Sequence, residues 1–447
     1  MLPLKLTKGP AGTLTRKDLF FIALGQVVGS GIVTVVGLAM KNTGPSAWLA
    51  YLTAILIGAL LVFPYLMVGS TIRLGGGVYS AVLALMGEKW AGIYCVSKIP
   101  SCVALASFPI TIGFYFGSIF PNINQTTVAV VFLVAFLFVQ IIGINIFAKV
   151  QKYMGYVLLV GMFAFVVFGF PHINWSYVSP SQPKFFTNGA LGFFTAVFLM
   201  ISSTKGYYMS IVFGRNAINA RRDVPKSMVF SFFAILIMYL GVSFVDIGVL
   251  PLDQVAGQPL TLVAKTVLPA VLFYLFIFGG VLMALTTSLN STFASMVREI
   301  ETGIEDGWLP TSWARKTKFG TSIFVILFVF LAALIPILTG FTVTKILNAM
   351  LLFTSVINII VFVGIFRLPK LYPEEWSKKT VKMSTGTFYV LMSIAMIFQL
   401  ATTAFSCRNL GLVTASIGLA SMAVAALYAY FRAKSGNYKI RMSVWSD

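Results

Sequence analysis

Three glycines and one serine fall near the middle of the first apolar run of the chain. The run extends from Leu19 to Met40, and its centre reads Gly25-Gln26-Val27-Val28-Gly29-Ser30-Gly31-Ile32-Val33. A helix in hydrocarbon must satisfy its backbone internally. A break at these residues frees N–H groups and a helix N-terminus, which suit an anion such as a carboxylate. Close helix packing is the alternative explanation of the same glycines.

A second polar stretch interrupts the sixth apolar run and contains a lysine. It reads Ile201-Ser202-Ser203-Thr204-Lys205-Gly206-Tyr207-Tyr208. Ionisable groups at membrane depth are functional candidates, because their burial is costly. Snorkelling towards an interface is the alternative for Lys205, but the residue lies deep in its run. Two interrupted spans at corresponding places in two repeats indicate a binding site near the midplane.

For the remaining polar residues within apolar runs, the evidence for a functional role is weaker. The stretch from Thr286 to Thr292 offers hydroxyl oxygens for Na⁺ or a substrate, and Thr287 and Ser288 are the coupling candidates in it. Such hydroxyls often only bond the preceding helical turn. We interpret Lys98 as a snorkelling side chain, with an inner gate as the alternative. Asp246 is interpreted as interfacial, with a proton or cation role as the alternative.

The composition predicts an all-α integral membrane protein. The chain of 447 residues is 58% hydrophobic and 10% charged, with a mean hydropathy of +0.93. The runs are continuously apolar, unlike the alternating strands of a β-barrel. At about 20 residues per span we expect about twelve helices, over 19–41, 47–72, 91–119, 126–148, 153–171, 188–213, 227–250, 268–297, 319–340, 342–366, 383–405 and 409–431.

The net charge of +20 indicates topology and attraction to anionic lipid, and not nucleic-acid binding. The loops on one side of the predicted spans, with both termini, hold most of the Lys and Arg residues. The other side holds only Lys41, Lys184, Lys265, Lys345 and Arg408. Because positive loops face the cytoplasm, both termini are expected inside, in a plasma or inner membrane.

Several classes of chemistry are absent from the sequence pattern. Cys95, Cys102 and Cys407 have no metal-ligand spacing, and His172, the single histidine, lies in an outer loop. The glycines 75–77 have neither dinucleotide nor P-loop spacing. The spans supply no nucleophile with a base and no carboxylate pair. We therefore expect no cofactor, no metal and no enzymatic activity.

Short motifs in order along nearly the whole chain resemble the amino acid–polyamine–organocation (APC) transporter superfamily, in its amino-acid permease branch. Each motif is weak alone, but their order and spacing are specific. They are Gly29-Ser30-Gly31-Ile32, Asn42-Thr43-Gly44-Pro45, Gly75-Gly76-Gly77-Val78-Tyr79, Asp223-Val224-Pro225, Arg298 with Asp306-Gly307-Trp308-Leu309-Pro310, and Arg367-Leu368-Pro369 with Pro373-Glu374.

The resemblance implies a LeuT-type fold with a 5+5 inverted repeat and two peripheral helices. A cytoplasmic segment 1–18 would precede one transporter domain, 19–431, with repeats over about 19–171 and 188–366, peripheral helices over about 383–431 and a cytoplasmic tail 432–447. Backbone amides around Ser30 to Ile32 would bind a substrate carboxylate, and carbonyls of both breaks would bind its amino group. The residues expected at the site are Val28, Gly29, Ser30, Gly31, Ile32, Ser202, Ser203, Thr204, Lys205, Gly206 and Tyr207.

Three departures from the family pattern affect the expected coupling and partners. No acid lies in 214–219, and Leu158 stands where many sodium-independent members have a lysine. Lys205 instead occupies the second break, as a built-in cation, a proton-titrating group or a reader of an anionic side chain. The loop from about Pro121 to Thr127 has no cysteine, which excludes a disulfide-linked heavy chain by that route.

The sequence therefore predicts a secondary transporter that works by alternating access, as an exchanger or a proton-coupled symporter. A neutral amino acid is the first choice of substrate, and H⁺ is preferred to Na⁺ as a coupling ion. Acidic amino acids, or other amine and organic-acid derivatives, are the alternative substrates. A substrate-sensing receptor or a channel is the alternative class. The oligomeric state stays open.

Overall fold

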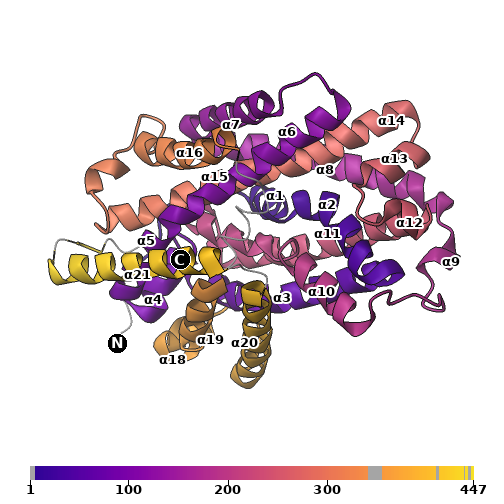
Figure 1. Ribbon diagram of the computed structural model, residues 1–447. Helices are drawn as coiled ribbons and strands as arrows, with labels where there is room; N and C mark the ends of the chain where they lie inside the picture. The colour runs from indigo at the N-terminus through magenta and orange to yellow at the C-terminus, as the bar shows by residue number, and fades with distance from the viewer. Residues whose placement is uncertain (1–5, 341–354, 409–411, 437, 441–443, 447) are drawn as a thin grey trace.

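The computed structural model describes residues 6–340, 355–408, 412–436, 438–440 and 444–446. The predicted span 342–366 lies mostly outside these residues, and its described end is helical over Ser355–Ile365. The start of the predicted span 409–431 lies outside them as well. Figure 1 shows the helical arrangement, with the termini marked.

Helices dominate the described residues, which confirms the all-α membrane fold class. Eight helical segments are long and apolar enough to cross a bilayer, and shorter apolar helices accompany them. The eight cover Val35–Thr71, Glu88–Gly117, Gln125–Ile142, Ile144–His172, Gly189–Asn216, Ala220–Gly248, Ala270–Glu305 and Thr385–Arg408.

The first predicted span consists of two helices with a break at the glycines. Helix α1 covers Arg16–Val27 and begins in a capping box between Thr15 and Asp18, a device that satisfies two backbone donors. Helix α2 covers Ser30–Thr43 and follows Gly29, whose φ and ψ are both −142°. The predicted interruption of this span is therefore confirmed.

The sixth predicted span is interrupted as well. Helix α10 covers Gly189–Ile201, and the 3₁₀ segment η4 covers Gly206–Asn216. The residues between them form turns. The run from Ser202 to Lys205 is therefore a break in the helix, as its polar composition predicts.

Two boundaries differ from the sequence prediction. Gly143, with φ of 110°, separates α7 (Gln125–Ile142) from α8 (Ile144–Gly169), although we expected a loop at 149–152. Lys152 lies within α8 and forms an ion pair with Asp18, so its charge does not require a loop. Helix α15, Leu282–Glu305, also continues past the predicted end at 297.

The other elements complete the bundle and its loops. Two short strands pair antiparallel, β1 (Arg73–Leu74) with β2 (Val444–Trp445). The remaining helices are η1 Gly44–Ser46, α3 Ala47–Thr71, α4 Val78–Met86, α5 Glu88–Ser101, η2 Cys102–Ala106, α6 Ser107–Ile119, η3 Phe170–His172, α9 Trp175–Val178, α11 Ala220–Gly248, α12 Leu252–Val255, α13 Thr261–Val267, α14 Ala270–Leu275, the π-helical turn η5 Phe276–Val281, η6 Thr311–Ala314, α16 Ile323–Leu338, α18 Leu368–Leu371, α19 Pro373–Ser377, α20 Thr385–Arg408 and α21 Leu412–Lys434.

Two groups of helices pack side by side and position the breaks between them. In the first group, α11 and η4 contact each other, and both contact α1 and α3. In the second group, α15 contacts α5, α6, α7 and α16. Helix α1 also contacts α15 and α8, so the first break faces the second group. Helices α20 and α21 lie against α3 and α5, at the margin of the bundle (Figure 1).

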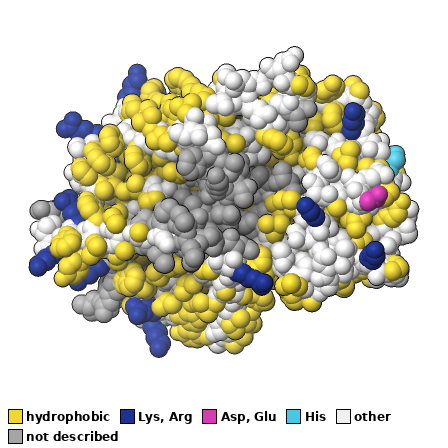
Figure 2. All heavy atoms as spheres, in the orientation of Figure 1, with side chains coloured by type: hydrophobic (Ala, Val, Ile, Leu, Met, Phe, Trp, Pro, Cys, Tyr) yellow, Lys and Arg dark blue, Asp and Glu magenta, His cyan; other side chains and the backbone are white. Residues whose placement is uncertain are grey.

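Apolar side chains cover much of the exposed surface, as expected for a protein surrounded by lipid. Examples of strongly exposed large side chains are Phe163, Ile237 and Val271. On the face seen in Figure 2, most Lys and Arg side chains lie towards the left, where Figure 1 marks the N terminus. We call this end, with residues 6–14, β1 and β2, the terminal face.

Candidate substrate site

The two breaks pack directly against each other, and glycines permit the contact. A Cβ atom on Gly31 would lie 2.0 Å from Cβ of Ser203, and one on Gly206 would lie 2.2 Å from the carbonyl oxygen of Gln26. Any larger residue would force the segments apart. The packing explanation of the glycines is thus correct, and it also brings both sets of predicted site residues together.

The start of α2 is the part of this junction that suits an anion. Among the described residues, no side chain caps the first turn that follows Gly29. The first N–H groups of a helix have no intrahelical partner, and the helix dipole adds positive charge there. Ser30, Gly31 and Ile32 supply these amides.

Two hydroxyl groups hold the carbonyl groups of the breaks. Oγ of Ser288 lies 2.7 Å from the Gly25 oxygen and 3.0 Å from the Val28 oxygen. The hydroxyl of Tyr239 lies 2.8 Å from the Val27 oxygen and 3.3 Å from the Ser203 oxygen. Tyr239 therefore bridges both breaks, a role that the sequence did not reveal because its apolar surroundings resemble those of any core tyrosine.

The predicted side chains of the second break do not all face the same way. Ser203 and Thr204 are buried, and Thr204 donates to the carbonyl oxygen of Ala54 at 3.0 Å. Tyr207 is buried too. Ser202 is exposed, and its hydroxyl bonds Leu199 of its own helix.

Lys205 is the one charged residue of the second break. It is half-buried, and its side chain has neither a hydrogen bond nor an ion pair with any residue that the structure describes. The first break has no charged side chain between Gly25 and Ile32. A cation whose side chain has no partner among the described residues is therefore near the junction of the two breaks.

Most hydroxyls on α15 bond their own helix, as the alternative explanation of that stretch expects. Thr287 donates to the carbonyl oxygen of Met283 at 2.7 Å, and Ser291 to that of Thr287 at 2.7 Å. Ser288 differs because it reaches α1. Among the described residues, no group of three His, Cys, Asp or Glu side chains could hold a metal ion.

The interpretation of Lys98 as a snorkelling side chain is wrong. Its Nζ atom lies 3.0 Å from Glu299 of α15, and the two side chains are 16% and 1% exposed. Glu299 also accepts from the Tyr94 hydroxyl at 3.0 Å and from the Val78 N–H at 3.3 Å. The sequence prediction missed this acid because it ended the eighth span at 297 and treated Glu299 as part of a loop.

A chain of buried amide side chains supports α1 from the other side. Gln140 donates to Asn290, and Asn290 donates to Gln151, both at 2.9 Å. Gln151 then donates to the carbonyl oxygen of Phe21 in α1 at 3.1 Å. Leu158 is buried in the same helix, α8, about two turns after Gln151. On this side α1 is thus held at Phe21 by neutral amide groups and at Asp18 by the ion pair with Lys152.

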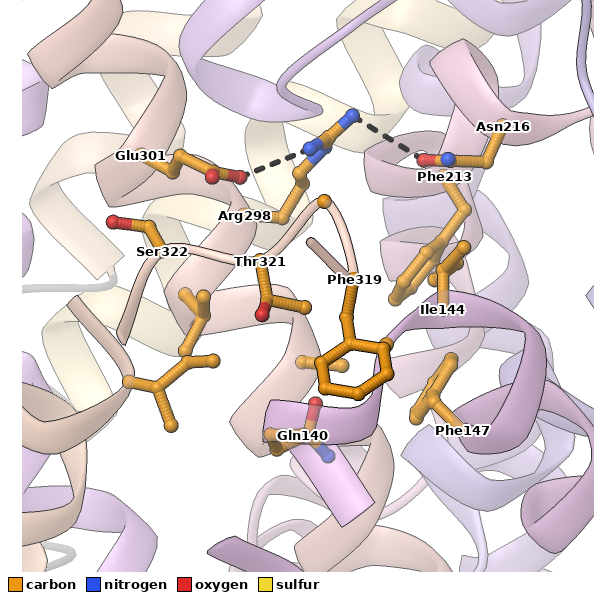
Figure 3. Close-up of a pocket in the computed structure, with 15 residues that line it drawn as sticks. Gln140, Ile144, Phe147, Phe213, Asn216, Arg298, Glu301, Phe319, Thr321 and Ser322 are labelled. Atoms are coloured by element: carbon orange, nitrogen blue, oxygen red, sulfur yellow. Dashed lines mark hydrogen bonds and ion pairs between the residues drawn. The ribbon is translucent and has the colours of Figure 1, made fainter. Parts of the chain in front are cut away.

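A pocket of about 100 Å³ with a mixed polar and apolar lining lies apart from the breaks, beside the C-terminal half of α15. Figure 3 shows Arg298 in it, between Glu301 and Asn216. The guanidinium donates to Glu301 at 2.9 Å and to Asn216 at 3.3 Å. None of the predicted site residues lines this pocket.

Comparison with known proteins identifies the family. The family described as "Amino acid permease" matches residues 14–431. This chain belongs to it. The family lies in the APC superfamily, and its members are transporters and not enzymes, so the predicted resemblance is confirmed.

Individual relatives are similar to this chain at 22–26% identity. The branched-chain amino acid permease BcaP of Bacillus subtilis is 26% identical over 56% of this chain and 58% of its own length. The methylthioribose transporter of the same species is 23% identical over 69% of this chain and 70% of its own length. An uncharacterized protein of Methanocaldococcus jannaschii, MJ0609, is 22% identical over 67% of this chain and 70% of its own length. The chain thus matches little more than half of the length of BcaP.

Proposed function

We propose that the protein is a secondary transporter that moves neutral amino acids across the membrane by alternating access. The observation that carries the proposal is the junction of two interrupted helices, with the uncapped first turn of α2 within it. Half-helix ends at such a junction suit a small zwitterion, because they offer N–H groups and carbonyl groups together.

The proposed binding mode uses main-chain groups for the part that all amino acids share. The carboxylate accepts from the amides of residues 30–32. The amino group donates to carbonyl oxygens at Val28 and at the second break. Ser288 and Tyr239 already bond some of these oxygens, but a carbonyl group has two lone pairs, so the held carbonyls remain available.

The substrate side chain is proposed to face Ser203 and Tyr207. The breaks contain no acid, which disfavours arginine and diamines. The name of BcaP puts branched-chain amino acids first in a substrate panel. Acidic amino acids are the second candidate, because the Lys205 side chain lies at the junction and has no partner in the part of the chain that the structure describes. The name of the methylthioribose transporter adds organic derivatives as a third.

The coupling and orientation are proposed from charge. A proton-coupled symporter would use Lys205 as its titrating group, whereas an exchanger would use it as a fixed cation. Na⁺ coupling through Thr287 and Ser288 ranks lower, since Thr287 bonds its own helix. The distribution of Lys and Arg supports an orientation with both termini in the cytoplasm. The proposed location is a plasma or inner membrane, and the proposed repeats are 19–171 and 188–366.

Uptake into proteoliposomes tests the proposal. Vesicles are loaded with unlabelled amino acids or with buffer, and labelled substrates are added with and without imposed H⁺ and Na⁺ gradients. Uptake that requires internal amino acid indicates an exchanger, and uptake driven by a proton gradient alone indicates a symporter. Tight, correctly reconstituted vesicles without saturable uptake of any amino acid would refute the substrate assignment.

Substitution of Lys205 separates its proposed roles. In Lys205→Ala, loss of proton-driven uptake with intact exchange indicates a titrating group. Loss of acidic substrates alone indicates a cation that binds the substrate side chain. Kinetics and pH dependence equal to those of the unchanged protein would exclude a central role for this lysine.

A further inference from the structure

Helices α1 and α11 begin close together, next to the terminal face. The N–H of Ile218 donates to the carbonyl oxygen of Leu14 at 3.0 Å. Each of these residues lies two positions before the start of its helix, at Ala220 for α11 and at Arg16 for α1. The two helices contact each other, so they leave the terminal face side by side.

An open groove of about 720 Å³ lies beside the start of α1 and extends to Phe230 of α11. The exposed surface of Phe230, at 51%, is continued along α11 by Phe233 and Ile237, which are exposed as well. Side chains at these spacings lie on one face of a helix. The groove thus opens onto an apolar face of α11. Its lining residues are Thr15, Arg16, Lys17, Phe20 and Phe230.

Basic side chains lie one helical turn before the phenylalanines, on the side of the terminal face. On α1, Arg16 and Lys17 precede Phe20 by four and three residues. On α11, Lys226 precedes Phe230 by four residues. Residues at these spacings are neighbours on the helix surface, about 5–6 Å apart. The groove therefore has cations at one end and aromatic rings at the other.

The acids near this end do not neutralise all of its cations. Arg16 and Arg222 both pair with the carboxylate of Asp223, at 3.0 and 3.1 Å. Two positive charges thus share one negative charge. The other acid at the start of α1, Asp18, is paired with Lys152, so it does not compensate the charge of the groove.

Two lysines at the groove are available to a ligand. Lys17 and Lys226 are exposed, and neither side chain has a hydrogen bond or an ion pair with a residue that the structure describes. The first amides of α1 are less available, because the capping box of Thr15 and Asp18 satisfies two backbone donors there. An anion at this place would therefore be bound by side chains.

We propose that the groove binds an anionic phospholipid, with the phosphate at Lys17 and Lys226 and the acyl chains against Phe20 and Phe230. The phosphate supplies the negative charge that the cations of the groove lack, and the acyl chains cover the exposed rings. In the proposed orientation the lipid comes from the cytoplasmic leaflet, which has a negative surface potential. The site does not depend on the proposed transport activity.

Calorimetric titration of the full chain in a neutral maltoside detergent tests the proposal. The probe is dioctanoyl phosphatidylglycerol, and dioctanoyl phosphatidylcholine is the comparison, because it has the same chains but no net charge. We expect the anionic lipid to bind about tenfold more tightly, since each basic residue near a membrane surface attracts anionic lipid. Glycerol 3-phosphate, which has no acyl chain, should not displace it.

This comparison needs no variant and can overturn the proposal by itself. Equal affinities for the two lipids would show that the cations of the groove do not select an anionic headgroup. Displacement of the anionic lipid by an equal concentration of glycerol 3-phosphate would show that a free phosphate compound is the ligand and that the rings have no part in the site.

The double variant Lys17→Gln, Lys226→Gln tests the cations. It should weaken binding of the phosphatidylglycerol by about tenfold and leave the thermal unfolding midpoint without lipid unchanged, because the two side chains bond no described residue. The matched control is Lys89→Gln with Lys382→Gln, which removes two exposed charges outside the groove. Equal affinities of the two double variants would refute the proposal.

Phe230→Ala tests the apolar end of the groove. It should weaken binding of both lipids by about threefold or more, because less apolar surface is buried. Phe194→Ala is the matched control, since Phe194 of α10 is 53% exposed and lies outside the groove lining. Unchanged affinity in Phe230→Ala would show that the lipid is attracted to a charged surface only, and the proposed groove site would be wrong.

Discussion

At the scale of single residues, Glu299 shows how a buried acid can be hidden in a sequence. It accepts from Tyr94 and Val78 and pairs with Lys98. The pair joins α5 to α15, and its members are separated by two hundred residues of chain. A buried ion pair is weak evidence for stability as a whole, but the loss of one partner leaves an uncompensated charge. Removal of the whole pair and removal of one partner can therefore be compared by substitution.

Lys98→Met is expected to destabilise the protein by about 3–5 kcal/mol, because it leaves Glu299 charged and unpaired in the interior. The thermal unfolding midpoint in detergent should fall by about 5 °C or more. Lys98→Met combined with Glu299→Gln removes both charges and should recover most of the loss, which a double-mutant cycle measures.

Lys89→Met is the matched control, since Lys89 is exposed on the same helix. It should leave the midpoint unchanged within about 1 °C. Equal thermal unfolding midpoints for Lys98→Met and Lys89→Met would show that the pair of Lys98 and Glu299 is not important for stability.

At the scale of elements, the contact between the two broken helices depends on glycine. The start of α2 and the turn after α10 approach so closely that Gly31 and Ser203 leave no room for a further carbon atom. Backbone groups at such a junction stay available only while the segments remain together. The geometry of the candidate site is thus a property of two helices and not of one motif.

Gly31→Ala is expected to reduce the initial rate of substrate uptake by about tenfold or more, because the new Cβ overlaps Ser203. A shift of the binding groups by about 1 Å can reduce a rate by about a hundredfold. Ser203→Gly, added to Gly31→Ala, removes the overlapping atom and should restore part of the rate. Uptake is normalised to the amount of protein in the vesicles.

Gly386→Ala is the control for a glycine-to-alanine change in a helix of the same protein. Its Cβ would have only Ser384 nearby, at 3.9 Å. Uptake should be unchanged in this variant. Normal uptake in Gly31→Ala as well would contradict the close junction of the two breaks.

The breaks could be predicted from sequence because their signal is local. Glycine and serine in an apolar run, or four polar residues before Gly206, conflict with a continuous helix wherever they occur. The all-α class likewise follows from the apolar runs. The partners of these segments could not be predicted, since Ser288 and Tyr239 reach them from other helices. The boundary at Gly143 was missed because Lys149 and Lys152 resemble a loop.

At the scale of the whole molecule, the charge distribution is the argument for orientation. At the end of the protein with the terminal face, Arg73, Arg221 and Arg298 each donate to a neighbouring segment, Arg298 to Asn216 of η4. The positive charges therefore have two roles, since they also stabilise the folded loops. The two roles are orientation in the membrane and stabilisation of the loops. A measurement of topology tests the first role alone, because only orientation depends on the membrane.

Labelling from one side of the membrane should reveal this topology. In a Cys407→Ser background, Lys184→Cys lies in the exposed loop before α10, and Lys434→Cys lies at the exposed end of α21. An impermeant maleimide should label Lys184→Cys in intact cells, and should label Lys434→Cys only after the membrane is permeabilised. The reverse pattern would place the termini outside.

The uncapped first turn of α2 has a consequence for how substrate range can change. Main-chain amides are present whatever the side chain, so alanine at residues 30 and 32 will not detect a carboxylate bound there, and the loss expected for Gly31→Ala reports the overlap with Ser203 instead. Replacement of one amide by an ester removes the N–H itself and would detect the carboxylate. Selection for a new substrate can therefore alter Ser203 or Tyr207 and change which amino acid is preferred, while the ability to hold an amino acid at all is left untouched.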